Sequence, residues 1–375
     1  MKKLKILFLT TRNIESPTEG LSHYSMAKAL QHYVGDVIPL IYPKPIKKWS
    51  PEYFLGKLKK PADKNFNEKV QSAAISINKS LKNIEFDLLF APMGSLLIPY
   101  LEINQPVIYL SDATFQLMNG YYFPKQPENS DIYLQRDNIE KLALKKANLI
   151  VLSNTWAFNS VIDHYKIDTK KVCIIHSGPN FECIPDNKSL SFYKMDGIIN
   201  LLMVGREWDR KGGDIGLEIV NTLNKHRVKS KLTICGMLPP VKYDKSIVNI
   251  YTFLDKTKNR DLIKLKELYQ ESHFLLFPSI AECNGIAGIE ANAFGLPVIA
   301  HNTGGLSDYV KPGYNGELVD SLIPEDYINK ILLYHNNAEK YKMLRFNSRQ
   351  EYELRLNWAV WANKLSEKIK EIFKN

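Results

Sequence analysis

Residues 277–319 have the sequence FPSIAECNGIAGIEANAFGLPVIAHNTGGLSDYVKPGYNGELV, and this stretch decides the fold. It predicts the end of a strand, an acidic loop, a short helix, a second strand and a glycine-rich turn. Glu282 and Glu290 are eight residues apart, with Gly285 and Gly288 between them. If a helix begins after Gly285, Glu282 lies in the loop and Glu290 lies in the first turns of the helix.

The predicted start of this helix contains small residues, so several backbone N–H groups there have no partner within the helix. Such groups, together with the helix dipole, form a natural site for an anion. Two carboxylates beside an anion site suit a ligand that carries both phosphate and hydroxyl groups. This description fits a nucleotide or a sugar phosphate.

The stretch resembles the E-x7-E signature of retaining GT-B glycosyltransferases, in particular the large family 4 group. Two glutamates at this spacing are common by chance, but the pattern is specific when the following strand and Gly-Gly turn are also in place. The matching segments are Pro278-Ser279, Glu290-Ala291, Gly295-Leu296-Pro297-Val298-Ile299-Ala300 and Gly304-Gly305. The alternative is one more helix–strand unit of an α/β sheet.

The length of 375 residues favours two domains, and successive strand–helix units predict an α/β fold. The resemblance implies the GT-B class, in which two Rossmann-like domains with parallel sheets face each other across a cleft. It places an acceptor domain over 1–185, a nucleotide-sugar donor domain over 197–356, and a terminal helix over 357–375 that packs back on the first domain. An ordinary amphipathic helix facing the core is an equal and compatible interpretation of 357–375.

The second half begins with a buried strand that ends at Gly205 and is followed by Arg206 and Lys211. This resembles the family element in which an arginine and a lysine bind the donor diphosphate, a leaving group that gains negative charge as the glycosidic bond breaks. An ordinary solvated loop is the alternative. The resemblance further implies that Glu290 accepts hydrogen bonds from the ribose hydroxyls and that Glu282 contacts the donor sugar.

Most of the other expected donor-site positions are glycines that follow strands or backbone groups at the helix start. The whole expected donor-binding set is Gly20, Gly178, Gly205, Gly236, Asn284, Gly285, Ile286, Ala287 and Glu290. The chain departs from the family in two places. Glu19-Gly20 stands where members typically have two glycines, and Cys283-Asn284 replaces the usual Gly-Phe, so the resemblance does not extend to how the donor sugar is held.

The predicted strand over 106–114 contains Ser111-Asp112 near its end. Residues just past the ends of parallel strands line the ligand crevice of open α/β sheets. Family members commonly have a His, or a His-Asp pair, at this place. The resemblance therefore makes Asp112 a candidate for orienting the reacting centre, and a helix-capping aspartate is the alternative. The expected catalytic set is Arg206, Lys211, Glu282 and Asp112.

The net charge of +10 fits nucleic acid, anionic lipid or phosphorylated substrates. Because no nucleic-acid motif accompanies the charge, we favour phosphate substrates or an anionic membrane surface. Residues 44–60 combine aromatic residues with lysines, and we interpret them either as an interfacial element or as an ordinary surface helix. Four scattered cysteines and the lack of a long apolar run predict a cytoplasmic protein, at most peripheral on the inner face of a membrane.

The expected activity is retaining, metal-independent transfer of a sugar from a nucleotide-sugar donor to a saccharide or lipid-linked acceptor, in the assembly of a surface polysaccharide or glycolipid. No D-x-D is present, so a metal-clamped GT-A enzyme is not expected, and neither a metal nor a cofactor is required. No G-x-G-x-x-G follows the first strand, which argues against a dehydrogenase. The alternatives are a GT-B epimerase, a phosphorylase-like enzyme and a non-catalytic sugar-nucleotide-binding scaffold.

Overall fold

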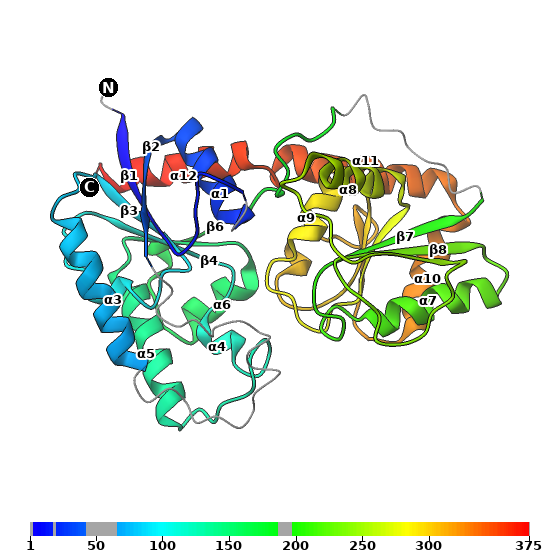
Figure 1. Cartoon of the computed structure of the whole chain (residues 1–375), viewed down its shortest axis with the longest axis horizontal. Helices are drawn as coiled ribbons and strands as arrows, with labels where there is room; N and C mark the ends of the chain where they lie inside the picture. Colours follow the sequence, from blue (N-terminus) through cyan, green and yellow to red (C-terminus); the bar gives the residue numbers. More distant parts are fainter. Residues whose placement is uncertain (1–2, 18–19, 43–65, 187–196, 375) are drawn as a thin grey trace. The chain divides into compact units, whose positions relative to one another are not determined.

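The computed structural model describes residues 3–17, 20–42, 66–186 and 197–374 (Figure 1). The chain divides into two compact units. Unit 1 consists of Met1–His176 and Trp361–Asn375, and unit 2 consists of Ser177–Val360. Residues 44–60, interpreted from the sequence as an interfacial element or a surface helix, lie outside the described residues.

Unit 1 is built on a parallel six-stranded sheet with the strand order β2-β1-β3-β4-β5-β6. The strands β3, β4 and β5 are buried along their whole length, which is why they are apolar runs without alternation. The strands are β1 Leu4–Thr10, β2 Gly35–Ile41, β3 Leu88–Pro92, β4 Val107–Ser111, β5 Leu149–Leu152 and β6 Val172–Ile174.

Helices cover both faces of this sheet. The helices α3, α5 and α6 pack on one face. The other face carries α1 and the last helix, α12, whose Trp361 ring meets Phe90 edge-on at 6.0 Å between centroids. The helices of unit 1 are α1 Leu21–Tyr33, α3 Phe66–Leu81, α4 Phe115–Met118, α5 Asp131–Lys146, α6 Thr155–Asp163 and, from Trp361 onward, α12 Trp358–Ile372.

Unit 2 has a second parallel six-stranded sheet, with the order β12-β11-β10-β7-β8-β9. The helices α7, α10 and α11 pack on one face of this sheet, and α8 and α9 pack on the other face. The strands are β7 Ile199–Val204, β8 Ser230–Cys235, β9 Val248–Tyr251, β10 Phe274–Phe277, β11 Val298–His301 and β12 Gly316–Val319. The helices are α7 Gly213–Lys225, α8 Asn259–Glu271, α9 Ile286–Ala293, α10 Pro324–His335 and α11 Ala338–Leu354.

The α/β class with two Rossmann-like sheets, predicted from the sequence, is confirmed. Residues 277–319 form the predicted succession of β10, loop, α9, β11, turn and β12. Among the described residues, no helix combines the length and the apolar character that crossing a bilayer would require.

One glycine is needed to bring two strand ends of unit 2 together. Gly236 follows β8 with a φ of +93°, and a Cβ there would lie 2.2 Å from the carbonyl oxygen of Gly205, which follows β7. The backbones therefore approach too closely for any side chain at 236.

Helix α5 carries a buried glutamate in unit 1. Glu140 is 5% exposed, and its carboxylate accepts a hydrogen bond from the Tyr109 hydroxyl of β4 at 2.9 Å. Burial raises the pKa of Glu140 from 4.5 to about 7, although hydrogen bonds from Ser95 and Tyr109 oppose this effect. The protonated form of Glu140 is therefore favoured by folding.

Glu140 gives the free energy of unfolding a specific pH dependence. Because its pKa is raised on folding, its stabilising effect is complete below about pH 4.5 and is lost as the pH rises through about 7. We expect Glu140→Gln to abolish this effect. The difference in unfolding free energy between wild type and variant should then change by ~3 kcal/mol across this window, as measured by urea unfolding at several pH values.

The matched control is Glu102→Gln, which removes an exposed carboxylate from the same unit. Its difference from wild type should stay flat with pH. If the difference in unfolding free energy between wild type and Glu140→Gln also stayed constant with pH, the raised pKa of Glu140 would be contradicted.

Candidate functional site

The loop between β7 and α7 holds Lys211 in a buried position. Lys211 is 7% exposed and lies over the Phe277 ring at 4.4 Å. A Cβ at Gly205 would lie 2.8 Å from the Lys211 side chain, so this glycine leaves room for the lysine. Gly212, with a φ of +69°, ends the loop and is the N-cap of α7.

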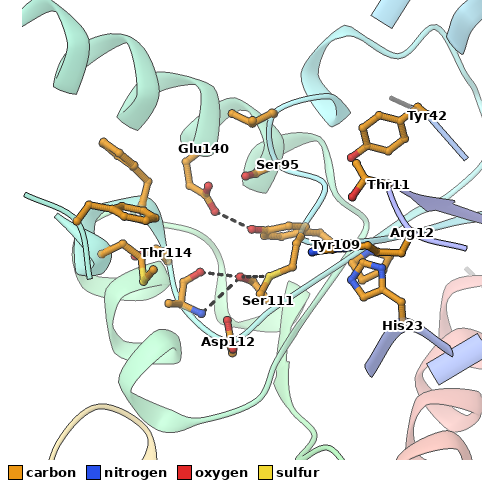
Figure 2. Close-up of a pocket in the computed structure, with 17 residues that line it drawn as sticks. Thr11, Arg12, His23, Tyr42, Ser95, Tyr109, Ser111, Asp112, Thr114 and Glu140 are labelled. Carbon is orange, nitrogen blue, oxygen red and sulfur yellow. Dashed lines mark hydrogen bonds between the residues drawn. The ribbon is translucent and has the colours of Figure 1, made fainter. Parts of the chain in front are cut away.

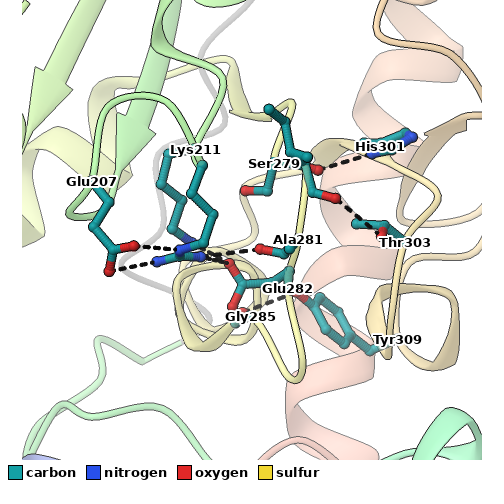
Figure 3. Close-up of polar contacts among 11 residues, drawn as sticks. Glu207, Lys211, Ser279, Ala281, Glu282, Gly285, His301, Thr303 and Tyr309 are labelled. Atoms are coloured by element: carbon teal, nitrogen blue, oxygen red, sulfur yellow. Dashed lines mark hydrogen bonds and ion pairs between the residues drawn. The ribbon is translucent and has the colours of Figure 1, made fainter. Parts of the chain in front are cut away.

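Lys211 forms a close ion pair with Glu282, which belongs to the loop after β10 (Figure 3). Arg210 lies beside them, 3.4 Å from a Glu282 oxygen and 2.9 Å from Glu207, and it also donates to the carbonyl of Ala281 at 3.0 Å. Burial lowers the pKa of Lys211, while Glu282 has the opposite effect. Two cations and two carboxylates thus meet at one edge of the sheet.

The structure does not bring Arg206 into this cluster. Its side chain is exposed and lies over the Phe253 ring, with 5.2 Å between the guanidinium carbon and the ring centroid. Arg210 is the arginine that contacts Glu282, and the sequence analysis did not single it out. The position of Arg210 next to Lys211 in the sequence was the signal that could have identified it.

The start of α9 is arranged as predicted, with Gly285 as N-cap at a φ of +61°. The Tyr309 hydroxyl donates to the Gly285 carbonyl at 2.9 Å, and a Cβ at Gly288 would lie 2.2 Å from that hydroxyl. Ile286 and Ala287 are half-buried. Because they form the first turn of the helix, their N–H groups have no partner within it. Tyr309 therefore supports the helix start without capping these N–H groups.

Glu290 lies in α9 and has a cation partner different from that of Glu282. It forms a close ion pair with Lys256 and accepts hydrogen bonds from the Tyr269 hydroxyl at 2.9 Å and from the Asn180 backbone at 3.2 Å. Lys256 also lies over the Phe181 ring at 4.3 Å. Neither Lys256 nor Tyr269 was found from the sequence, because both come from segments with no family motif.

Two further predicted donor-site residues have packing roles in unit 2. A Cβ at Gly178 would lie 2.7 Å from the Trp358 indole and backbone, and the Trp358 indole N–H donates to the carbonyl of Pro179 at 2.7 Å. Asn284 is buried and donates to the Ser177 hydroxyl at 2.8 Å. These contacts fix the segment that begins unit 2 against α9 and Trp358.

The remaining predicted residues, Gly20 and Asp112, belong to unit 1. Gly20 precedes α1, and a Cβ there would lie 2.9 Å from the Arg12 side chain. Asp112 follows β4 and lines a pocket, and its carbonyl accepts a hydrogen bond from Asn154 at 2.9 Å. The N-cap of α4 is Thr114, not Asp112.

The pocket of unit 1 has a volume of about 430 Å³ and lies at the carboxyl ends of β1, β3 and β4 (Figure 2). One side has Glu140, Ser95 and Tyr109, and the other has Arg12 and His23. Ligands of open α/β sheets bind at this edge. The pocket is therefore the candidate ligand site of unit 1.

His23 is neutral at physiological pH. Burial, and secondarily Arg12, lowers its pKa to about 4, and its ring nitrogen Nδ1 lies 2.8 Å from the Thr10 hydroxyl. Arg12 thus supplies the positive charge on this side of the pocket. Among the described residues, no group of three or more His, Cys, Asp or Glu side chains could hold a metal ion.

Residues 191–351 match the family of glycosyl transferases group 1. The D-inositol 3-phosphate glycosyltransferase of Paenarthrobacter aurescens is 23% identical over 212 residues, which make up 52% of this chain and 51% of that protein. The chain spans about half the length of several curated relatives that it matches.

Two solved structures share the fold over almost the whole chain. Sucrose-phosphate synthase from Thermosynechococcus elongatus superposes with a TM-score of 0.72 at 17% identity, covering 99% of this chain and 100% of that one. Anabaena HepE in complex with UDP superposes with a TM-score of 0.65 at 15% identity, covering 98% of this chain and 100% of that one. The chain has the GT-B fold, and its residues 191–351 match the glycosyl transferases group 1.

Proposed function

We propose that this chain is a retaining, metal-independent glycosyltransferase that moves a sugar from a nucleotide-sugar donor to a saccharide or lipid-linked acceptor. The main support is the buried Lys211–Glu282 pair beside the start of α9, inside the segment that matches the family. The HepE structures hold UDP, UDP with glucose, and UDP-glucose, which supports a nucleoside diphosphate as the leaving group.

The diphosphate gains negative charge as its bond to the sugar breaks. Lys211 and the N–H groups at Ile286 and Ala287 would stabilise this charge, and Arg206 would join them from the same loop as Lys211. Such preorganised groups are worth ~10²–10³ in rate each. In the proposed step, the acceptor oxygen bonds to the anomeric carbon on the face that the phosphate leaves, and the acceptor proton passes to the departing phosphate oxygen.

Glu282 would have two tasks. Its ion pair with Lys211 holds the ammonium at the site. Its carboxylate is an acceptor-only group that can also take hydrogen bonds from donor-sugar hydroxyls. Asp112, in unit 1, would orient the acceptor or the reacting centre and is not assigned as a nucleophile.

Glu290 would bind the ribose hydroxyls. One of its oxygens is used by Lys256 and Asn180, whereas the other accepts a hydrogen bond from Tyr269 alone among the described residues. A carboxylate oxygen has two acceptor positions, so the second oxygen keeps one for a ribose hydroxyl.

The proposed setting is the assembly of a surface polysaccharide or glycolipid at the cytoplasmic face of a membrane. It is supported by the net charge of +10 and by the aromatic and basic sequence of 44–60.

The activity is tested by incubating the full chain with UDP-, GDP- and ADP-linked sugars and a panel of saccharide and lipid-linked acceptors, with and without EDTA. We expect release of nucleoside diphosphate and a glycoside with the donor's anomeric configuration, identified by proton NMR and unaffected by EDTA. An inverted product would contradict retention, and loss of activity in EDTA would contradict metal independence. If the donor were epimerised and no glycoside formed, the activity would be epimerisation of the nucleotide sugar and not glycosyl transfer.

Lys211→Ala should lower kcat by ~10²–10³-fold, because the charge on the leaving diphosphate loses its buried cation. The measurement is nucleoside diphosphate release at saturating donor. Lys231→Ala, which removes an exposed lysine of β8, is the control and should keep wild-type turnover.

The double variant K211M/E282Q separates a folding defect from a catalytic one, because it leaves no unpaired buried charge. It should fold and still be slow. Near-normal turnover in any folded Lys211 variant would remove Lys211 from the reaction.

Glu290→Gln should weaken UDP binding by about ten- to a hundredfold, because a hydrogen bond to a charged group is lost. Calorimetry with UDP and with 2′,3′-dideoxy-UDP isolates the ribose contribution. Wild type should prefer UDP, and the variant should bind both nucleotides alike. An undiminished preference for UDP in the variant would exclude Glu290 from the ribose site.

A further inference from the structure

The pocket of unit 1 is of a size suited to a small polar ligand. Its volume of about 430 Å³ lies within the ~300–1,000 Å³ typical of small-molecule sites. Apolar side chains form much of the lining, together with a few polar groups that face inward (Figure 2). The apolar lining residues include Pro92, Met93, Leu96, Ala113, Phe115 and Phe123.

These walls suit a sugar ring. The ring has C–H faces that pack on aromatic and aliphatic side chains, and its edge carries hydroxyls that need hydrogen-bond partners. Phe115 is the first residue of α4, Phe123 lies in the loop after α4, and Tyr42 follows β2. Aromatic rings therefore line the pocket from separate elements.

Glu140 differs from the other buried glutamates of the described residues. Four of them have a cation partner: Glu282 has Lys211, Glu290 has Lys256, Glu317 has Lys330, and Glu351 has Lys311 and Arg355. Within the described part of the chain, Glu140 has no ion pair. Its partners are hydroxyls, those of Tyr109 and Ser95.

The ionised form of Glu140, which predominates above about pH 7, still has acceptor capacity. It offers about four lone-pair sites, and the Tyr109 and Ser95 hydroxyls occupy two of them. Burial without a cation is costly, so hydrogen-bond donors from a ligand would be favourable here. Sugar hydroxyls supply such donors, whereas an anionic group would be repelled.

We propose that this pocket binds an uncharged sugar ring of the acceptor and that Glu140 selects it by accepting hydrogen bonds from its hydroxyls. The inference rests on the proposed function for the identity of the ring as acceptor. Arg12 and His23 lie on the other side of the pocket from Glu140 (Figure 2). Arg12, the cation among the lining residues, therefore does not neutralise Glu140.

The experiment measures saturation-transfer NMR of the full chain at about pH 8, where Glu140 is mostly ionised, with glucose, galactose, mannose and myo-inositol as neutral probes. Glucuronate and galacturonate serve as anionic probes of similar shape. Each probe is titrated with and without saturating UDP. We expect at least one neutral probe to bind and its uronate counterpart, where tested, to bind at least tenfold more weakly.

Two variants separate selection from packing. Glu140→Gln keeps the shape of the side chain but removes its charge, so it should weaken the neutral probe by about tenfold and narrow the preference over the uronate. Phe123→Ala should weaken both kinds of probe while the ratio between them stays the same. Glu102→Gln, away from the pocket, should behave as wild type.

Three results would overturn the inference: no neutral probe binds, uronates bind as well as neutral probes, or Glu140→Gln keeps the wild-type preference. Calorimetry with UDP on the same samples distinguishes this failure from failure of the proposed function. Binding of UDP without any sugar leaves the donor site intact and rejects the pocket. Binding of a sugar probe without turnover of any nucleotide sugar supports the pocket and rejects the proposed function.

Discussion

The buried ion pair between Lys211 and Glu282 is the interaction on which the site of unit 2 depends. It joins the loops that follow β7 and β10, which are neighbouring strands of one parallel sheet. Both loops must be compact for the two side chains to meet, and two glycines allow this. A Cβ at Gly205 would meet the Lys211 side chain at 2.8 Å, and one at Gly212 would lie 2.2 Å from the Pro278 carbonyl. Because an unpaired buried charge is costly, the pair holds both loops in place.

The spacing of the two glutamates has a physical explanation in this arrangement. Glu282 lies in the loop before α9 and pairs with Lys211, whereas Glu290 lies inside α9 and pairs with Lys256. The helix start between them presents N–H groups at Ile286 and Ala287. The E-x7-E pattern therefore places two separately neutralised carboxylates on either side of one helix N-terminus. This arrangement would suit a ligand with phosphate in the middle and hydroxyls at both ends.

Local pattern was enough to predict the elements, because apolar runs and glycines determine where strands end and α9 begins. Lys211 and Glu282 were both named from the sequence as members of the expected catalytic set. Their contact, however, spans 71 residues, and so does that of Arg210 with the Ala281 carbonyl. Lys256 and Tyr269 could not be predicted, since strand order decides which loops become neighbours. The same limit explains Arg206, whose exposed position over Phe253 no sequence pattern reveals.

Glu140 illustrates how a fold can leave a polar group that stability alone does not explain. Its helix buries Tyr133, Ile139, Ala143 and Leu144 as well, so an apolar side chain at 140 would fit the same face. Glutamine would keep a hydrogen-bonding partner for Tyr109 at a much smaller desolvation cost. The raised pKa of Glu140, about 7, measures what burial costs the ionised form. Four other buried glutamates of the described residues are neutralised by lysine or arginine, so hydrogen-bond donors of a ligand in the adjoining pocket would stabilise the ionised form of Glu140, which has no cation partner.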